Sequence, residues 1–246
     1  MIPLFLLWGS FLNVLSFRII NGYSLLKARS FCPNCKNTVP FYDNIPILSW
    51  FLLKGACRYC KKPISFLYPF IEATTCLLLT LLFYKVDIKF FFSYFIFFSA
   101  LIVSIRSDLQ YMLISRFVTL YILFIGPLLA WYKLLPISLY ESISGIIFGY
   151  FILYGLANLF FYITKKNGMG QGDFELLAFI GSFIGIIGCW SSLLIGSTIG
   201  SLLGVSYITI FKKNRSTKIP FGPFLAFGAT TFVLFQKTIL QVIMPY

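Results

Sequence analysis

Two aspartates lie at the ends of apolar segments in a chain that contains no histidine. Asp173 opens an apolar run in GMGQGDFELLAFIG (168–181), and Asp108 follows another in RSDLQYM (106–112). Without histidine, acid–base chemistry must rest mainly on carboxylates. Two carboxylates that meet and share one proton supply one acid and one base near neutral pH, and they titrate as a unit. The pair therefore favours aspartic-protease chemistry, in which the base activates water and the acid protonates the substrate carbonyl.

The glycines before Asp173 favour a close approach of the backbone to a ligand. Gly170 and Gly172 can adopt positive φ at little steric cost. Irregular backbone at membrane depth is tolerated where it lines a wet cavity, and an extended substrate peptide could dock there. Asp173 has a simpler alternative role as the N-cap of its helix, which aspartate often fills.

The charged neighbours of the two aspartates leave a second alternative open. Asp108 could form an ion pair with Arg106 or Arg116 at the membrane surface. Glu175 follows Asp173 by two positions, about 200° around a helix, so we expect it to point away from Asp173. An ionisable group at the centre of a membrane helix costs about 2.5–3.5 kcal/mol on insertion scales, and such groups therefore call for a reason.

Four cysteines form two C-x2-C pairs, CPNC (32–35) and CRYC (57–60), with 21 residues between them. This spacing predicts one tetrahedral zinc ion bound by Cys32, Cys35, Cys57 and Cys60. Four thiolates close the coordination sphere, which is typical of a structural site rather than one that activates water. The alternatives are two disulfides or unrelated free thiols. Disulfides are disfavoured if the loop faces a reducing compartment.

The composition predicts an all-α polytopic membrane protein. Of 246 residues, 59% are hydrophobic and only 11% are charged, which is far from the usage of soluble domains. No alternating strand pattern suggests a barrel. We expect about eight transmembrane helices, at 2–20, 67–84, 90–105, 117–132, 143–163, 174–188, 190–211 and 221–241. The sixth and seventh, separated only by CW, could be two helices with a tight turn or one broken unit.

The charge distribution predicts the orientation. The chain has 20 Lys and Arg against 7 Asp and Glu. With the N-terminus outside, only Lys85, Lys89, Lys133 and Lys237 fall on the outer side, a strongly positive-inside distribution. The basic excess then reflects the cytoplasmic leaflet, and we expect membrane lipid and no nucleic acid as a partner. The first segment is expected to be a retained helix rather than a signal peptide. The cysteine loop (21–66) and both aspartates face the cytoplasm.

Several motifs, in order along nearly the whole chain, resemble the type IV prepilin leader peptidases, a branch of the GxGD intramembrane aspartyl proteases. GSFLNVLSFRI (9–19) is similar to the first-helix signature of that family. The cysteine loop running into the second helix (31–75) and SDLQYMLIS (107–115) follow. GMGQGDFELLAFIG is similar to the GxGD segment, and KIPFGPFLAFGA (218–229) to the motif that opens the last helix.

The resemblance implies a single membrane-embedded peptidase domain over residues 1–246, containing the zinc loop 21–66. It implies Asp108 and Asp173 as catalytic residues, supported by Gly170 and Gly172 of the GxGD loop. Members cut a short basic leader from prepilins and pseudopilins of pilus and secretion systems, at the cytoplasmic face of the bacterial inner membrane. Cleavage falls after a glycine, just before an apolar helix. Many members then methylate the new N-terminus with S-adenosylmethionine, and the cysteine loop is typical of such bifunctional enzymes. No residue can be assigned to the methyl donor.

Two departures from the family pattern bear on this expectation. Leu113–Arg116 replaces a turn that often reads Leu-Pro-Asp/Asn, and Glu175 stands where the family often has lysine. Neither departure removes a proposed catalytic group. Two other functions remain open: a transporter or channel whose acids bind ions, and a zinc-stapled membrane scaffold without catalysis. The transporter leaves the cysteine loop unexplained, and the two retained aspartates argue against the scaffold.

Overall fold

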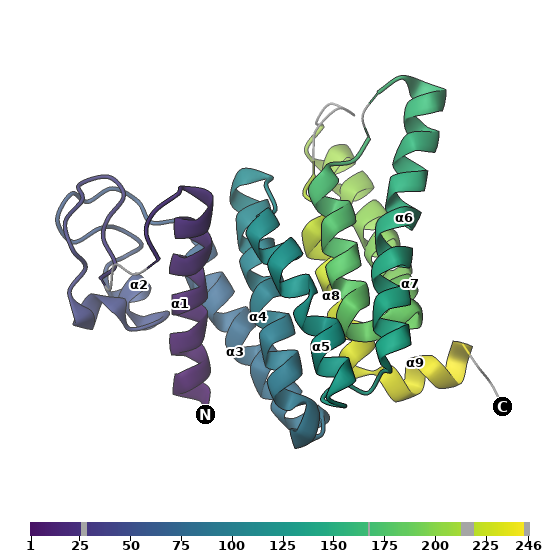
Figure 1. Cartoon of the computed structure of the whole chain (residues 1–246). Helices are drawn as coiled ribbons and strands as arrows, with labels where there is room; N and C mark the ends of the chain where they lie inside the picture. The colour runs from purple at the N-terminus through teal and green to yellow at the C-terminus, as the bar shows by residue number, and fades with distance from the viewer. Residues whose placement is uncertain (26–28, 167, 213–218, 244–246) are drawn as a thin grey trace. The chain divides into compact units, whose positions relative to one another are not determined.

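The computed structural model describes residues 1–25, 29–166, 168–212 and 219–243, and within these ranges every regular element is a helix (Figure 1). The predicted all-α fold is confirmed. Among the described residues, β pairing is limited to two isolated antiparallel bridges, and both lie in the cysteine loop. The chain divides into two compact units, Met1–Lys85 and Val86–Tyr246, which we describe separately. The single domain over 1–246 stays a prediction.

In the first unit, α1 (Ile2–Ile20) packs along α3 (Leu67–Lys85). The helices approach closely at Gly9, where a Cβ atom would lie 3.0 Å from the Cα atom of Glu72. Asn13 also donates a hydrogen bond from Nδ2 to the Tyr68 carbonyl oxygen, 3.1 Å away. Small residues and interhelical hydrogen bonds of this kind are the usual means by which membrane helices associate.

The loop between α1 and α3 contains the short helices η1 (Phe41–Asn44) and α2 (Leu48–Leu52). Ile47, at the start of α2, has a φ of 64°, which is unusual for a β-branched residue. Its N–H group donates to Oε2 of Glu72 on α3, at 2.8 Å. The buried Glu72 carboxylate therefore anchors the loop to the helix that follows it.

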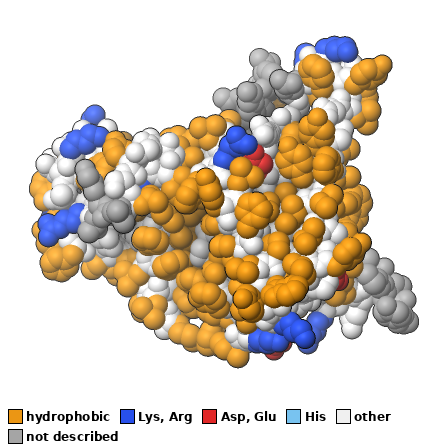
Figure 2. Space-filling view, viewed as in Figure 1, with side chains coloured by type: hydrophobic (Ala, Val, Ile, Leu, Met, Phe, Trp, Pro, Cys, Tyr) orange, Lys and Arg blue, Asp and Glu red, His pale blue; other side chains and the backbone are white. Residues whose placement is uncertain are grey.

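The second unit is built around α4 (Ile88–Tyr111) and α7 (Gln171–Ile210). Phe97 of α4 packs against Phe179 and Phe183 of α7, with ring centroids 5.4 and 5.0 Å apart. The other elements of this unit are η2 (Phe117–Tyr121), α5 (Ile125–Trp131), α6 (Leu139–Thr164), α8 (Gly222–Leu234) and α9 (Gln236–Ile243). Figure 2 shows hydrophobic side chains over most of these helices, with Lys and Arg near their ends.

The element α7 is two helices joined by a reversal at Gly185, where φ is 69° and ψ is −174°. Cβ atoms on Gly222 and Gly200 would lie 3.3 Å from Leu176 and 3.1 Å from Phe224, respectively. Leu176 and Gly200, on the two halves of α7, therefore both lie near the first turn of α8. On a straight helix these two residues would be about 36 Å apart, so the chain must reverse between them. The predicted pair of helices with a tight turn is confirmed, but the turn lies at Gly185 instead of at CW (189–190), because glycine adopts this conformation without strain.

Five described helices are long and apolar enough to cross a membrane: α1, α3, α4, α6 and α7. The predicted span 117–132 is divided between η2 and α5, and 221–241 is divided between α8 and α9. The protein is thus a multi-pass membrane protein, while the total of eight spans stays a prediction. Four of the basic residues used for the orientation, Lys27, Lys213, Arg215 and Lys218, lie outside the described residues.

Candidate active site and metal centre

Asp108 lies in the last turn of α4 and is 5% exposed. Its Oδ2 atom accepts a hydrogen bond from the N–H group of Gly222, at 3.0 Å. Gly222 is the first residue of α8, so the carboxylate lies at the positive end of that helix. Of the two arginines considered as partners, Arg106 donates to the Gln110 side chain and Arg116 forms an ion pair with Glu175. The alternative pairing of Asp108 with Arg116 is therefore wrong.

Asp173 is the third residue of α7, and the N-cap of this helix is Gly170. The alternative role of Asp173 as an N-cap is therefore also wrong. Gly170 has a φ of −83°, and the glycines with positive φ among the described residues are Gly22, Gly55 and Gly185. Contrary to expectation, neither glycine of the GxGD loop uses positive φ. Gly172 instead packs closely, since a Cβ atom there would lie 3.0 Å from Cβ of Ile114.

A short chain of contacts brings the two aspartate-bearing elements together. A Cβ atom on Gly222 would lie 2.8 Å from Oδ2 of Asp108 and 3.4 Å from Cδ1 of Ile114. Ile114 in turn touches Gly172, which precedes Asp173. These contacts bring the last turn of α4, which bears the buried Asp108, next to the first turn of α7, which bears the half-buried Asp173.

Glu175 has partners that sequence reasoning missed. Its carboxylate, 3% exposed, accepts hydrogen bonds from Nε of Arg116 at 3.1 Å and from Oγ1 of Thr119 at 3.2 Å. Two of the residues that depart from the family pattern are therefore partners. Their opposite charges were the available signal, because a basic residue at 116 and an acidic residue at 175 compensate each other.

The four loop cysteines form the predicted cluster. The sulfur atoms of Cys32, Cys35, Cys57 and Cys60 all lie within 4.8 Å of one another. The Cys32 and Cys60 sulfurs are 3.9 Å apart, close to the edge of about 3.8 Å expected for a tetrahedron of thiolates around zinc at about 2.3 Å. All four thiols are free, so the two-disulfide alternative is not what the structure holds. The residues present fit a tetrahedral metal ion.

The two C-x2-C turns repeat one backbone conformation. In the first, Lys36 has a φ of 61° and its N–H group bonds to the Cys32 carbonyl oxygen at 2.9 Å. In the second, Lys61 has a φ of 56° and bonds in the same way to Cys57 at 3.0 Å. An antiparallel bridge closes each turn. This local repeat escaped the sequence reasoning because only the cysteines and one lysine recur at matching positions.

The thiols of the cluster are shifted in opposite directions: backbone hydrogen bonds lower the pKa of Cys57, whereas desolvation and the neighbouring thiols raise the pKa of Cys35 to about 11. The N–H groups of Cys60 and Tyr59 lower the pKa of the Cys57 thiol to about 7, and the thiolate is the form that binds metal.

Arg58 donates to both carboxylate oxygens of Asp43, each at 2.6 Å, and thereby holds the pKa of Asp43 below its usual range. A carboxyl whose pKa is lower in the folded than in the unfolded chain stabilises the folded state. This stabilisation is fully present above the pKa of aspartate in the unfolded chain, about 3.9, and is lost as the pH falls below it. The pair is therefore intact at neutral pH.

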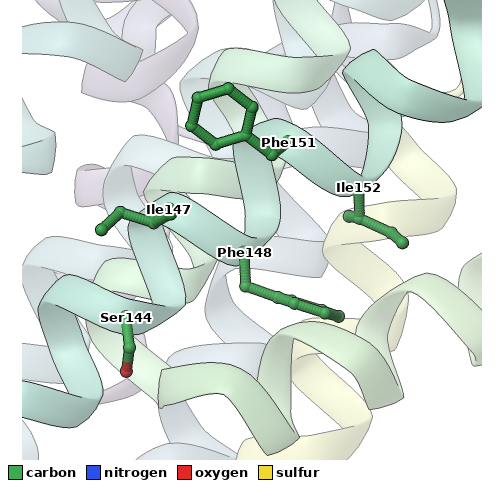
Figure 3. A pocket seen from close by; sticks show the side chains of 5 residues that line it. All are labelled: Ser144, Ile147, Phe148, Phe151 and Ile152. Carbon is green, nitrogen blue, oxygen red and sulfur yellow. The ribbon is translucent and has the colours of Figure 1, made fainter.

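A surface hollow of about 460 Å³ lies on α6, and neither aspartate lines it (Figure 3). Its lining is apolar apart from one hydroxyl and consists of Ser144, Ile147, Phe148, Phe151 and Ile152. It contains no titratable group, so it offers no acid–base chemistry.

Two family models match the chain in succession. The model described as the bacterial peptidase A24 N-terminal domain matches residues 4–86, and the model of the type IV leader peptidase family matches residues 95–208. The first match ends where the first compact unit ends. No solved protein structure matches the chain significantly.

Curated relatives match over most of their length. A prepilin leader peptidase/N-methyltransferase of Legionella pneumophila is 35% identical over 91% of this chain and 78% of its own. One of Aeromonas hydrophila with the same name is 34% identical over 89% and 76%. A type 4 prepilin-like proteins leader peptide-processing enzyme of Escherichia coli is 32% identical over 94% and 91%.

Proposed function

The chain belongs to the type IV leader peptidase family, and from this premise we propose that it is a membrane aspartyl endopeptidase that removes the leader peptide from type IV prepilins or pseudopilins. Cleavage takes place at the cytoplasmic face of the bacterial inner membrane, and N-methylation of the new N-terminus follows. The observation that carries the proposal is the series of contacts that runs from Asp108 through Gly222 and Ile114 to Gly172, which directly precedes Asp173. These contacts join the helix end that bears Asp108 to the helix turn that bears Asp173.

The proposed chemistry uses Asp108 and Asp173 as a pair that holds one proton. Oδ2 of Asp108 accepts the Gly222 N–H bond, so this oxygen is unprotonated and the shared proton lies on another oxygen of the pair. The unprotonated carboxylate takes a proton from water, which attacks the scissile carbonyl carbon, while the other carboxyl protonates the carbonyl oxygen. When the C–N bond breaks, the proton taken from water passes to the leaving amine, and a hydroxyl of the gem-diol intermediate returns a proton to the other carboxylate as the product carboxyl group forms. The pair has then regained its starting protonation.

The four cysteines would hold a zinc ion with a structural role, since four thiolates leave no open position for water or substrate. S-adenosylmethionine would supply the methyl group, and no residue of this chain is assigned to it. The orientation we propose places the N-terminus outside and the cysteine loop and both aspartates on the cytoplasmic side. There a basic leader can reach the site while the apolar helix of the substrate stays in the bilayer.

The test is cleavage of a prepilin from the same cell by the purified protein in liposomes, read by mass spectrometry. Asp108→Asn and Asp173→Asn preserve shape but remove a titrating carboxylate, and we expect each to lower the cleavage rate by at least about 100-fold. A mass increase of one methyl group that requires S-adenosylmethionine would establish the second activity. Unimpaired cleavage by either variant would refute that aspartate's role.

Two other functions have distinct outcomes in the same preparation. If the zinc-loaded parent cleaves no prepilin, the scaffold without catalysis gains support. Ion flux into the same liposomes would instead indicate the transporter, whose acids would bind the ion.

A further inference from the structure

Glu175 is a buried carboxylate that the proposed cleavage chemistry does not use. Each of its oxygens has its own donor, Nε of Arg116 at 3.1 Å and Oγ1 of Thr119 at 3.2 Å. Thr119 is fully buried, whereas the Arg116 side chain is 66% exposed. A buried carboxylate is tolerated only where such partners compensate for lost hydration. The pairing therefore fixes the position of Glu175 relative to both partners.

The partners of Glu175 belong to the segment that leaves the helix of Asp108. Met112 ends α4 in the left-handed conformation, and its N–H group bonds to the carbonyl oxygen of Asp108 itself, at 2.9 Å. The chain then passes through Arg116 into the π-helix η2, which contains Thr119. Single π-helical turns are frequent at functional sites. A shift of Arg116 and Thr119 would thus be transmitted over a few residues to Asp108.

Glu175 also shares a helix face with Gly172, three residues earlier. Gly172 touches Ile114 of the same segment. The first turn of α7 is therefore held against residues 114–119 at two points, and Asp173 lies between these points in sequence. Because Gly172 and Glu175 hold this face of the turn in place, they also fix the direction in which Asp173 points from another face of the same turn.

We propose that Glu175, Arg116 and Thr119 form a clamp that sets the separation and orientation of the two catalytic carboxylates, with Glu175 as a positioning residue. The clamp joins the segment that starts at Asp108 to the helix turn that carries Asp173. Because a displacement of about 1 Å in a reacting group can cost about 100-fold in rate, loosening the clamp lowers turnover more than substrate binding. This inference rests on the proposed peptidase function.

The experiment is a charge exchange across the clamp, measured by steady-state cleavage of a prepilin in liposomes. We expect Glu175→Lys and Arg116→Glu each to lower kcat by about 10–100-fold while KM stays within about threefold. The double variant restores an ion pair, since the Thr119 hydroxyl can accept a bond from lysine as well as donate one to glutamate. We expect its kcat to return to within about fivefold of the parent.

Two further variants make the result specific. Lys166→Glu, just beyond α6, changes the net charge as Arg116→Glu does and should leave kcat and KM near the parent values. Glu175→Gln keeps an acceptor but loses the charge, so it should lower kcat by about tenfold even if the charge-reversed variants fold poorly.

The proposal is overturned if Glu175→Gln and Glu175→Lys keep the kcat of the parent. It is also overturned if thermal unfolding shows that the double variant is folded but its kcat is no higher than those of the single variants. A raised KM with unchanged kcat also overturns it, because Arg116 would then contact the substrate. Failure of the proposed function looks different: it is loss of cleavage by the parent itself, or full activity in Asp108→Asn or Asp173→Asn.

Discussion

At the residue scale, the site depends on how closely the backbone of α8 approaches Asp108. The Gly222 N–H group lies 3.0 Å from Oδ2, and a Cβ atom on the same residue would lie only 2.8 Å from that oxygen. Glycine is required here for space, so that its N–H group can reach the carboxylate. At Gly170, by contrast, a Cβ atom would make an ordinary 3.7 Å contact with Asp173.

We therefore expect Gly222→Ala to lower kcat for prepilin cleavage by about tenfold or more, since the carboxylate must move to admit a methyl group. Steady-state kinetics in liposomes measures this. Gly204→Ala is the matched control, because its added Cβ atom would lie 3.4 Å from Ile219, an ordinary contact. Equal activity of the two variants would show that the close approach at Gly222 is unimportant.

At the scale of elements, the face of α6 that carries Gly145 and Gly149 packs directly on the backbone of α7. A Cβ atom on Gly145 would collide with the carbonyl group of Gly181, and one on Gly149 would lie 2.5 Å from the Leu177 carbonyl oxygen. Ser142 reinforces the contact by donating to the Ser182 carbonyl oxygen at 2.6 Å. In lipid, such close packing replaces the hydrophobic effect as the force between helices.

Gly145→Ala should accordingly destabilise the second unit by about 1–3 kcal/mol, the usual cost of overpacking. Gly155→Ala, on the same helix, adds a Cβ atom with nothing within 4 Å and should be neutral or slightly stabilising. Thermal unfolding in detergent micelles compares the two. A melting temperature for Gly145→Ala at or above that of Gly155→Ala would contradict the close packing.

At the scale of the whole molecule, the two compact units carry separate tasks. The four-cysteine cluster lies in Met1–Lys85, and both aspartates and the proposed clamp lie in Val86–Tyr246. The boundaries of the two matching family models agree with this division. We expect a loop with so few buried apolar side chains to depend on the proposed zinc ion for folding.

Removal of zinc by a chelator, or Cys57→Ser, should therefore unfold the loop while the helices of the second unit persist. Trypsin would then cut quickly at basic residues of the loop such as Lys36, Lys54, Arg58 and Lys61. Mass spectrometry of the fragments, with circular dichroism for helix content, measures both effects. A loop that resists trypsin without metal would refute the structural role of zinc, and loss of the second unit's helices would refute its independence.

The sequence by itself determined the features that depend on local pattern. Apolar runs specify membrane helices because lipid demands that each backbone polar group bond within its own segment. The two C-x2-C pairs specified a four-sulfur cluster, since thiolates at this spacing suit one tetrahedral ion. The scarcity of acids in apolar surroundings singled out Asp108 and Asp173, because a carboxylate there is costly.

Only the tertiary structure decided which groups meet across long separations. Gly222 reaches Asp108 across 114 positions, and Arg116 reaches Glu175 across 59. Local periodicity carries no information about such pairs, which depend on how helices pack and where the chain reverses. The reversal at Gly185 shows the same limit, since several glycines in the apolar run could supply the conformation and packing against α6 and α8 selects one.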